Sequence, residues 1–199
     1  MAVLHAVPRR WSVGDYNRMV ELGLLGEHER VELIDGEVLR LLPKERGHAA
    51  VDAQLGWALR QALPKDFIVR EHLPLDINAC SQPEPDFAVV DRLMLEEKPY
   101  PRSPYLVIEV PNHCQRYHRE VKSALYASAG IEEYWVVKVT GLRGVEVFTE
   151  PMATDSGEHP FGYHYSKAVF LGESEQICPL LHPDVRLNVS DLFPKEELS

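Results

Sequence analysis

The chain has 199 residues and a mass of 22.7 kDa, and because a domain of this size buries about 70% of its unfolded surface, we expect one domain over residues 1–199. Hydrophobic residues at 45% and charged residues at 26% exclude disordered, collagen-like and coiled-coil chains, and the lack of a membrane-length apolar run or a signal-peptide pattern favours a cytoplasmic protein with no membrane partner. The net charge of -10 argues against nonspecific binding to phosphate backbones, although a local basic patch could still bind nucleic acid.

Two helices are expected in the first third of the chain. Ser12 followed by Asp15 is a capping-box pattern, which predicts a helix from residue 13 to about residue 25. A second helix is predicted between His48, which opens it, and Pro64, which closes it. Its apolar residues recur at helical spacing: Val51, Leu55, Ala58, Leu59 and Ala62.

A β-hairpin is predicted between these helices, in the segment RVELIDGEVLRLL. The pair Asp35-Gly36 separates two β-prone runs, which is the usual signal for a type I′ turn. Because side chains alternate along a strand, we expect Glu32 to point to the face opposite that of Val31 and Leu33.

The middle of the chain predicts a covered sheet. The runs PDFAVVD and YLVIEV are nearly free of polar interruptions, EYWVVKV and VEVFTE follow as consecutive strands, and YHYSKAVFL is an expected edge strand. One more helix is expected between Pro111 and Gly130. The predicted fold class is therefore α/β, with a mixed sheet flanked by helices and with an N-terminal helix and hairpin. The aromatic residues Tyr134, Trp135 and Phe148 are interpreted as core and dimer-interface residues.

Two carboxylates, Asp86 and Glu109, lie at or in apolar strands of this predicted sheet. A buried carboxylate must be compensated by a hydrogen-bond donor, a cation or a metal ion, and two together favour a hard divalent ion such as Mg²⁺ or Mn²⁺. Lys122 follows on the next predicted helix and can pair with a phosphate. The alternative is a structural pair of carboxylates that accept hydrogen bonds from the backbone.

The sequence segments around these residues resemble those of a known family. The sequence ERVELIDGEV, a Gly-His pair opening a helix, PDFAVV, LVIEV, a downstream lysine and YASAGIEEYWVV together resemble the Uma-type bacterial restriction endonucleases, within the PD-(D/E)xK nuclease superfamily. The resemblance covers roughly residues 11–148 and implies a restriction-endonuclease-like fold.

The resemblance also implies roles for individual residues. Asp86 and Glu109 match the family's metal ligands, and the backbone carbonyl of Val110 would add a third oxygen. Many superfamily members carry their lysine two positions after the glutamate, where this chain has Pro111. Lys122 matches the lysine that this family keeps on the following helix, where it would orient water or stabilise charge in the transition state.

Glu32 and His48 match upstream acidic and histidine positions of the family. Glu32 would hold a second ion or act through water, or would be a surface carboxylate of the hairpin. His48 would contact the scissile phosphate or order the site, or would cap a helix. The implied function is a Mg²⁺- or Mn²⁺-dependent endonuclease that hydrolyses phosphodiester bonds, with DNA as the expected substrate and a homodimer as the expected assembly.

The chain departs from the family pattern at five positions: Asn112, His113, Cys114, His118 and Lys138. These changes remove negative charge or replace small polar groups, and they leave open an alternative function, a catalytically decayed nuclease fold that only binds a partner. We also considered a zinc site. Cys114, His118, Lys122 and Tyr126 recur every four residues and would form one helical ridge next to His113, but a further ligand would have to come from elsewhere.

Overall fold

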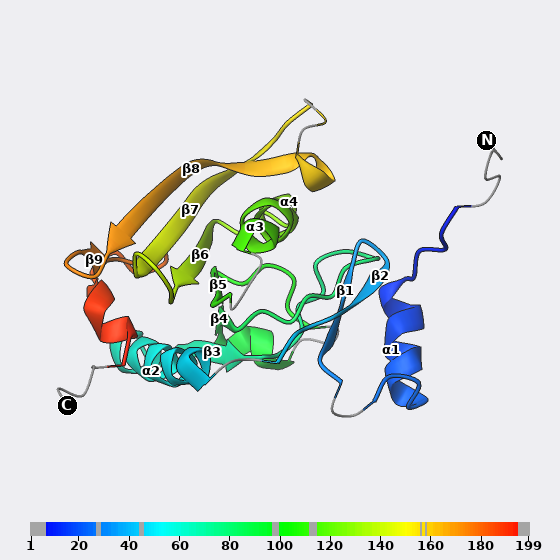
Figure 1. The fold of residues 1–199 in the computed structure, drawn as a ribbon, viewed down its shortest axis with the longest axis horizontal. Helices are drawn as coiled ribbons and strands as arrows, with labels where there is room; N and C mark the ends of the chain where they lie inside the picture. The colour runs from blue at the N-terminus through cyan, green and yellow to red at the C-terminus, as the bar shows by residue number, and fades with distance from the viewer. Residues whose placement is uncertain are drawn as a thin grey trace.

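A six-stranded mixed sheet forms the centre of the molecule (Figure 1). The computed structural model describes residues 7–26, 29–43, 46–96, 100–111, 115–155, 157 and 159–194. The sheet order follows the chain: β3 (Phe67–Glu71), β4 (Phe87–Asp91), β5 (Leu106–Glu109), β6 (Glu133–Lys138), β7 (Gly144–Ala153) and β8 (Tyr163–Gly172). Only the pair β5 and β6 is parallel within this sheet, so the predicted mixed sheet is confirmed, with β8 as an edge strand.

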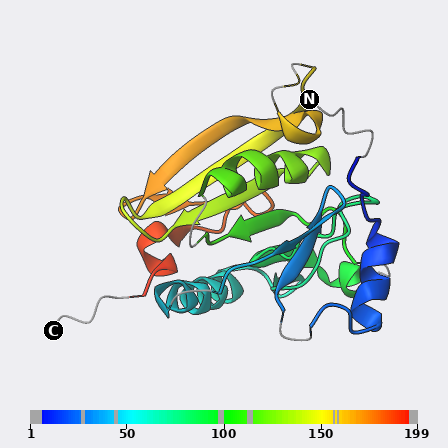
Figure 2. The same ribbon diagram turned by 45° about the vertical axis from the view of Figure 1, so that its right-hand side comes forward.

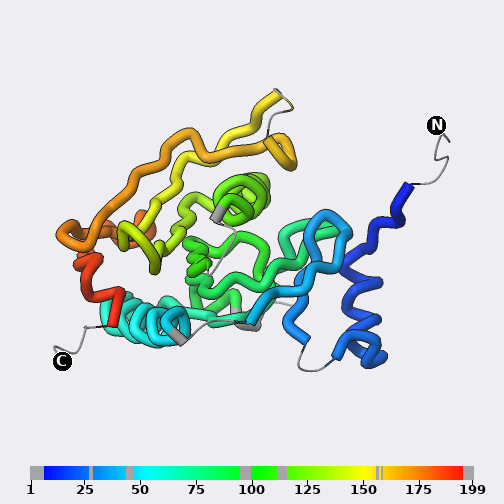
Figure 3. The backbone as a smooth tube through the Cα atoms, in the orientation of Figure 1, coloured from blue at the N-terminus to red at the C-terminus, as the bar shows by residue number. Residues whose placement is uncertain are grey.

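The remaining elements surround this sheet. They are α1 (Val13–Glu21), β1 (Val31–Ile34), β2 (Glu37–Arg40), α2 (Arg46–Ala62), a 3-10 helix (Arg92–Glu96), α3 (Gln115–Tyr117), a π-helical turn (His118–Lys122), α4 (Ser123–Ser128), a 3-10 turn (Pro160–Gly162), β9 (Gln176–Ile177), β10 (Leu187–Asn188) and a last 3-10 turn (Val189–Leu192). Helix α1 lies at one end of the molecule and the last 3-10 turn lies at the other (Figure 3).

Two apolar clusters pack on the two faces of the sheet. Alternation along β5 assigns Ile108 to the cluster that α2 covers and Val107 to the cluster that α4 covers. The helical segment of α3, the π-helical turn and α4 lies against β7 and β8 (Figures 1 and 2). This arrangement positions the end of β5 beneath the helix that follows it, so residues from both elements can meet.

Helix α1 begins as predicted and ends earlier than predicted. The Ser12 hydroxyl accepts a hydrogen bond from the Asp15 backbone N–H, and the Asp15 carboxylate accepts one from the Ser12 backbone, which confirms the capping box. The helix ends at Glu21 because Gly23 adopts a φ of 68° and its N–H turns back to the Val20 carbonyl. The predicted end near residue 25 was therefore wrong.

The hairpin of β1 and β2 confirms the predicted turn. Asp35 and Gly36 have φ values of 48° and 75°, and a type I′ turn requires positive φ at both positions. Val31 and Leu33 pack against Tyr16 of α1, whereas Glu32 points to the opposite face, as the alternation predicted. The hairpin thus places the Glu32 carboxylate on the face directed away from α1.

The aromatic residues named from the sequence are core residues. Tyr134 and Trp135 are completely buried and Phe148 is 8% exposed within this chain. Their assignment to the core is confirmed, while a role in a dimer interface is wrong because the chain itself already covers them. Among the described residues, no helix combines the length and the apolar character that crossing a bilayer demands.

Candidate active site

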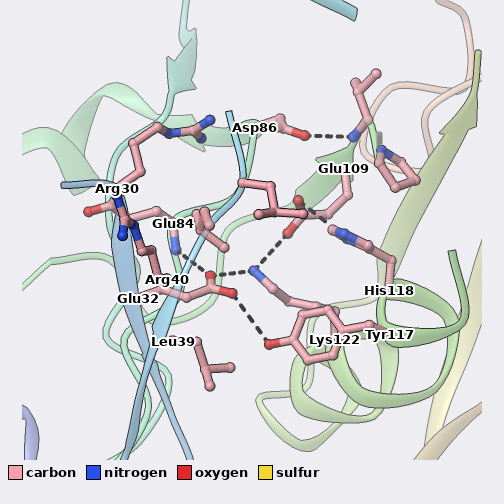
Figure 4. A pocket seen from close by; sticks show the side chains of 14 residues that line it. Arg30, Glu32, Leu39, Arg40, Glu84, Asp86, Glu109, Tyr117, His118 and Lys122 are labelled. Carbon is pink, nitrogen blue, oxygen red and sulfur yellow. Dashed lines mark hydrogen bonds and ion pairs between the residues drawn. The ribbon is translucent and has the colours of Figure 1, made fainter. Parts of the chain in front are cut away.

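A cavity of about 470 Å³ opens between the hairpin, the sheet and the π-helical turn (Figure 4). Its walls come from four places in the chain: the β1–β2 hairpin, the loop before β4, the end of β5 and the turn His118–Lys122. Most of the residues singled out from the sequence meet here. Asp86, Glu109, Lys122 and Glu32 all line the cavity, and so does Val110.

Strand register brings Asp86 and Glu109 together. Phe87 of β4 pairs with Ile108 of β5, so the next position in this antiparallel ladder places Asp86 opposite Glu109 on the same face. Both residues are buried: Asp86 is 5% exposed and Glu109 is 3% exposed. Asp86 Oδ2 accepts a hydrogen bond from the Val110 backbone N–H at 2.6 Å, which orients the carboxylate at the end of β5.

Lys122 lies between two carboxylates. Its Nζ donates to Glu32 Oε2 at 2.6 Å and to Glu109 Oε1 at 3.1 Å, and the residue is only 2% exposed (Figure 4). Tyr126, one helical turn later, donates its hydroxyl to the same Glu109 oxygen at 2.7 Å. Lys122 thereby connects the hairpin to the sheet through the helix that follows β5.

The π-helical turn explains how so many side chains of one helix reach the cavity. A π turn brings residues five apart onto one side, which aligns Tyr117 with Lys122, and the α-helical spacing then aligns Lys122 with Tyr126. Tyr117 donates its hydroxyl to Glu32 Oε1 at 3.3 Å. An uninterrupted α-helix would have turned Tyr117 away from Glu32.

The buried charges of the cavity are unbalanced. Burial raises the pKa of the Glu109 carboxyl to about 7, and repulsion from Asp86 and Glu32 opposes the lowering effect of Lys122. Burial by itself would lower the pKa of Lys122, but Glu109 and Glu32 outweigh it and raise that pKa above its ordinary value. Lys122 is therefore charged at neutral pH, and burial makes the Glu109 carboxyl harder to ionise than an exposed glutamate.

Glu32 is a buried member of the cavity. The residue is 0% exposed and its Oε2 also accepts a hydrogen bond from the Glu84 backbone N–H at 3.3 Å, so the interpretation as a surface hairpin carboxylate is wrong. A strand-borne carboxylate is kept buried here because Lys122 and Tyr117 both donate to it.

His48 lies beside the cavity and does not cap its helix. Helix α2 begins at Arg46, so His48 is its third residue, and a cap must precede the first helical residue. His48 is 2% exposed, and its Nε2 lies 3.2 Å from the carbonyl oxygen of Pro111, which directly follows the β5–Val110 segment. The ring therefore contacts the chain just beyond Glu109, and the capping interpretation is wrong.

The departures from the family pattern fall in different places. Asn112, His113 and Cys114 lie outside the described residues. His118 lines the cavity, with its Nδ1 3.7 Å from Glu109 Oε2. Lys138 lies near the Phe170 ring, with Nζ 5.3 Å from its centre, and is not a cavity residue.

Sequence reasoning missed several cavity residues, among them Glu84, Arg30 and Arg40. Burial, together with repulsion from Glu32, raises the pKa of Glu84. A local signal existed for two of them, since Glu84 stands two residues before Asp86 and Arg30 stands two residues before Glu32. Residues two apart in extended chain share a face.

A second cluster of possible cation ligands shares Asp86. Oxygen and nitrogen atoms of Asp52, His72 and Asp86 lie within 4.8 Å of one another. His72 Nδ1 is 3.5 Å from Asp86 Oδ1, and its Nε2 is 3.9 Å from Asp52 Oδ2. Within the described part of the chain, His118 belongs to no such cluster of three or more ligand side chains, which leaves the zinc interpretation without support there.

The donor set of the cavity fits a hard divalent cation. Three buried carboxylates, Glu32, Asp86 and Glu109, face one buried ammonium, so the cavity has an excess of negative charge. Carboxylate oxygens are the ligands that Mg²⁺ and Mn²⁺ prefer, commonly one or two of them together with waters. Both oxygens of Glu32 accept hydrogen bonds, from Tyr117 and Lys122, whereas the two donors to Glu109 share its Oε1. Asp86 and Glu109 Oε2 are therefore the groups that would hold the ion.

A mixed sheet with opposed carboxylates at the ends of adjacent strands, and a lysine from the following helix, defines a restriction-endonuclease-like α/β protein. A comparison with family models matches residues 13–190 to Uma2, a family described as "Putative restriction endonuclease". The chain belongs to this family. Family membership and fold together support a nuclease, and the match extends well beyond residue 148, where the sequence resemblance ended.

A solved structure has a similar fold. A crystal structure described as "a putative nuclease belonging to DUF820 from Anabaena variabilis ATCC 29413" superimposes with a TM-score of 0.67 at 15% identity, covering 92% of this chain and 97% of that chain. The type IIG restriction endonuclease BpuSI aligns with 56% of this chain and 12% of its own chain, at 20% identity and a TM-score of 0.34. A comparison with curated proteins found no match.

Proposed function

We propose that this chain is a divalent-metal-dependent endonuclease that hydrolyses phosphodiester bonds of DNA, with Mg²⁺ or Mn²⁺ as the cofactor. The observation that carries the proposal is the constellation of Asp86 and Glu109 at opposed strand ends with Lys122 bonded to Glu109. We infer that Asp86 and Glu109 hold the ion, with the carbonyl of Val110 as a further ligand. A bound divalent ion supplies Lewis acidity at the attacked phosphate and makes a bound water more acidic.

The side chains of the cavity have separate tasks in this proposal. An ammonium group has three N–H donors, and Lys122 uses two of them on Glu32 and Glu109, so the third is available to a phosphate oxygen or to the attacking water. Glu32 and Tyr126 are positioning residues, since Glu32 holds Lys122 and Tyr126 orients Glu109. His48 orders the chain after β5 through its contact with Pro111.

Titration of Mn²⁺ into the metal-free protein by calorimetry tests this proposal before any target sequence is known. We expect binding to the wild type and loss of binding in Asp86→Ala and in Glu109→Gln. Glu133→Gln is the matched control, because Glu133 is also a buried strand carboxylate but accepts from Trp135 and Leu180, outside the cavity. Absence of Mn²⁺ binding in the folded wild type would contradict the proposal and favour a decayed nuclease fold.

A plasmid-cleavage assay with Mg²⁺ then tests the reaction itself. We expect cleavage by the wild type and loss of cleavage in Lys122→Met, a variant that keeps both Asp86 and Glu109. Mn²⁺ binding that persists in Lys122→Met while cleavage is lost would assign Lys122 to catalysis. Retained cleavage in Lys122→Met would contradict that role.

A further inference from the structure

The hairpin wall of the cavity carries two arginines, Arg30 and Arg40, on the side away from His118 (Figure 4). Arg30 directly precedes β1 and shares its face with Glu32, two residues later. Its backbone carbonyl accepts a hydrogen bond from the Leu41 N–H at 2.8 Å, which extends the hairpin ladder to this position. Arg30 is therefore held on the ordered hairpin, next to the buried acids.

Arg30 is half-buried, and among the described residues its guanidinium forms no hydrogen bond or ion pair, while its charge acts to lower the pKa of the nearby Glu84. Arginines elsewhere in the chain do pair with carboxylates within 3.1 Å, among them Arg10, Arg18, Arg116 and Arg119. Arg40 is 78% exposed, and its Nε is 3.9 Å from Glu29 Oε1. Both guanidinium groups thus retain donors that can face a ligand in the cavity.

The charge of Lys122 is already compensated within the cavity. The Lys122 ammonium lies between Glu32 and Glu109, and the same cavity contains Glu84 and Asp86. A phosphate polymer that enters such an acidic cavity on a chain of net charge -10 must gain attraction from other cations. Arg30 and Arg40 are the arginines of the cavity lining, and a guanidinium fork matches two phosphate oxygens.

We infer that Arg30, assisted by Arg40, forms a second phosphate subsite that binds a backbone phosphodiester of the nucleic acid next to the one that is cut. This inference rests on the proposed nuclease function and adds where the substrate backbone runs. Arg30 is a binding residue in this arrangement, and the backbone crosses from the hairpin wall toward Lys122. The ligand is the phosphodiester itself, so Arg30 contributes affinity without reading bases.

Binding of a fluorescein-labelled DNA duplex, measured by anisotropy with Ca²⁺ in place of Mg²⁺ over about 50 to 200 mM salt, tests the subsite. We expect Arg30→Gln to weaken binding roughly tenfold and to reduce the slope of log affinity against log salt by about 1, as for one lost phosphate contact. Arg40→Gln should have the same direction and a smaller effect. Arg30→Lys should keep the salt slope and lose part of the affinity, because the charge stays and the fork is lost.

Arg186→Gln is the matched control. Arg186 is exposed and precedes β10, which pairs with β9 at the end of the molecule opposite the hairpin (Figure 1). The Arg186→Gln variant should bind DNA like the wild type. The Arg30→Gln variant should bind Mn²⁺ like the wild type. Equal affinity and salt slope for Arg30→Gln and the wild type would overturn the subsite alone. A wild type that binds Mn²⁺ but no nucleic acid would overturn the subsite and the nuclease function together.

Discussion

Lys122 is the residue on which the charge balance of the cavity depends. Its removal leaves Glu32 and Glu109 buried without their shared cation, and breaking a buried ion pair typically costs about 3–5 kcal/mol. We therefore expect Lys122→Met to lower the free energy of unfolding by that order, as measured by urea denaturation of the metal-free protein. Adding Glu32→Gln should restore part of the loss, because it removes one of the unpaired charges.

Arg116 provides the comparison for this prediction. Arg116 and Glu120 form an exposed i,i+4 pair with 86% and 54% of their side chains accessible. Exposed helical pairs contribute about 0.3–0.5 kcal/mol, so Arg116→Met should change the unfolding free energy by no more than that. Similar losses for Lys122→Met and Arg116→Met would contradict the view that buried charge dominates this cavity.

Glu109 should make the stability of the metal-free protein depend on pH. Its pKa is about 7 in the folded chain and 4.5 as the ordinary value, so the folded state binds the proton more tightly than the unfolded state. The resulting stabilisation is complete below pH about 4.5 and is lost as the pH rises through about 7, with a magnitude of the order of 3 kcal/mol. Thermal unfolding in EDTA from pH 5 to pH 8 should show this decline in the wild type.

Glu109→Gln is the test of that assignment, since an amide does not titrate. As the pH rises, the wild type should lose stability relative to Glu109→Gln, so the difference between their free energies of unfolding should change. A pH-independent difference would mean that Glu109 ionises in the folded chain as it does in the unfolded chain. Other raised carboxyl groups, such as Glu84, remain in both proteins and cancel in the comparison.

At the scale of elements, the hairpin carries Glu32 to the cavity and depends on Gly36. Gly36 has φ 75°, and a Cβ there would lie 2.6 Å from Arg10 Cβ and 2.9 Å from the Trp11 backbone nitrogen. Gly36→Ala should therefore combine left-handed strain, about 1–2 kcal/mol, with a steric clash against the segment before α1. Urea denaturation should show a loss larger than the strain alone.

Gly141→Ala separates the two contributions. Gly141 has φ 72°, and no described atom outside its own neighbours lies within 4 Å of the position that an alanine Cβ would take, so alanine there meets strain without a clash. We expect its cost to be about 1–2 kcal/mol, with Gly36→Ala costing more. Equal costs would mean that residues 10 and 11 move aside freely and do not hold the hairpin in place.

At the scale of the whole molecule, the proposed assembly is a homodimer. Cutting both strands of a duplex is simplest with two symmetric active sites, and each chain contributes one candidate site at the Asp86–Glu109 pair. Sedimentation velocity should therefore give about twice the chain mass of 22.7 kDa. A particle with the mass of one chain, both alone and with DNA and Ca²⁺, would contradict the dimer.

Local patterns were enough for much of this molecule. The capping box at Ser12, the Asp35-Gly36 turn and the apolar strands depend on residues adjacent in sequence, and all three are confirmed. The end of α1 was missed because Gly23 and Gly26 are both suitable helix terminators, and only Gly23 adopts the left-handed conformation. The π-helical turn was missed because no residue pattern distinguishes it from an α-helix.

The sheet, the hairpin and three of the residues that line the cavity, Asp86, Glu109 and Lys122, could be predicted from the sequence. A carboxylate among apolar strand residues is conspicuous without any structure, because its burial must be compensated. Three contacts could not be predicted and come from the packing of distant segments: Glu32 is buried against Lys122, His48 contacts Pro111, and Arg30 lines the cavity. The first two contacts join residues 90 and 63 positions apart, and side-chain proximity over such separations depends on how the layers pack.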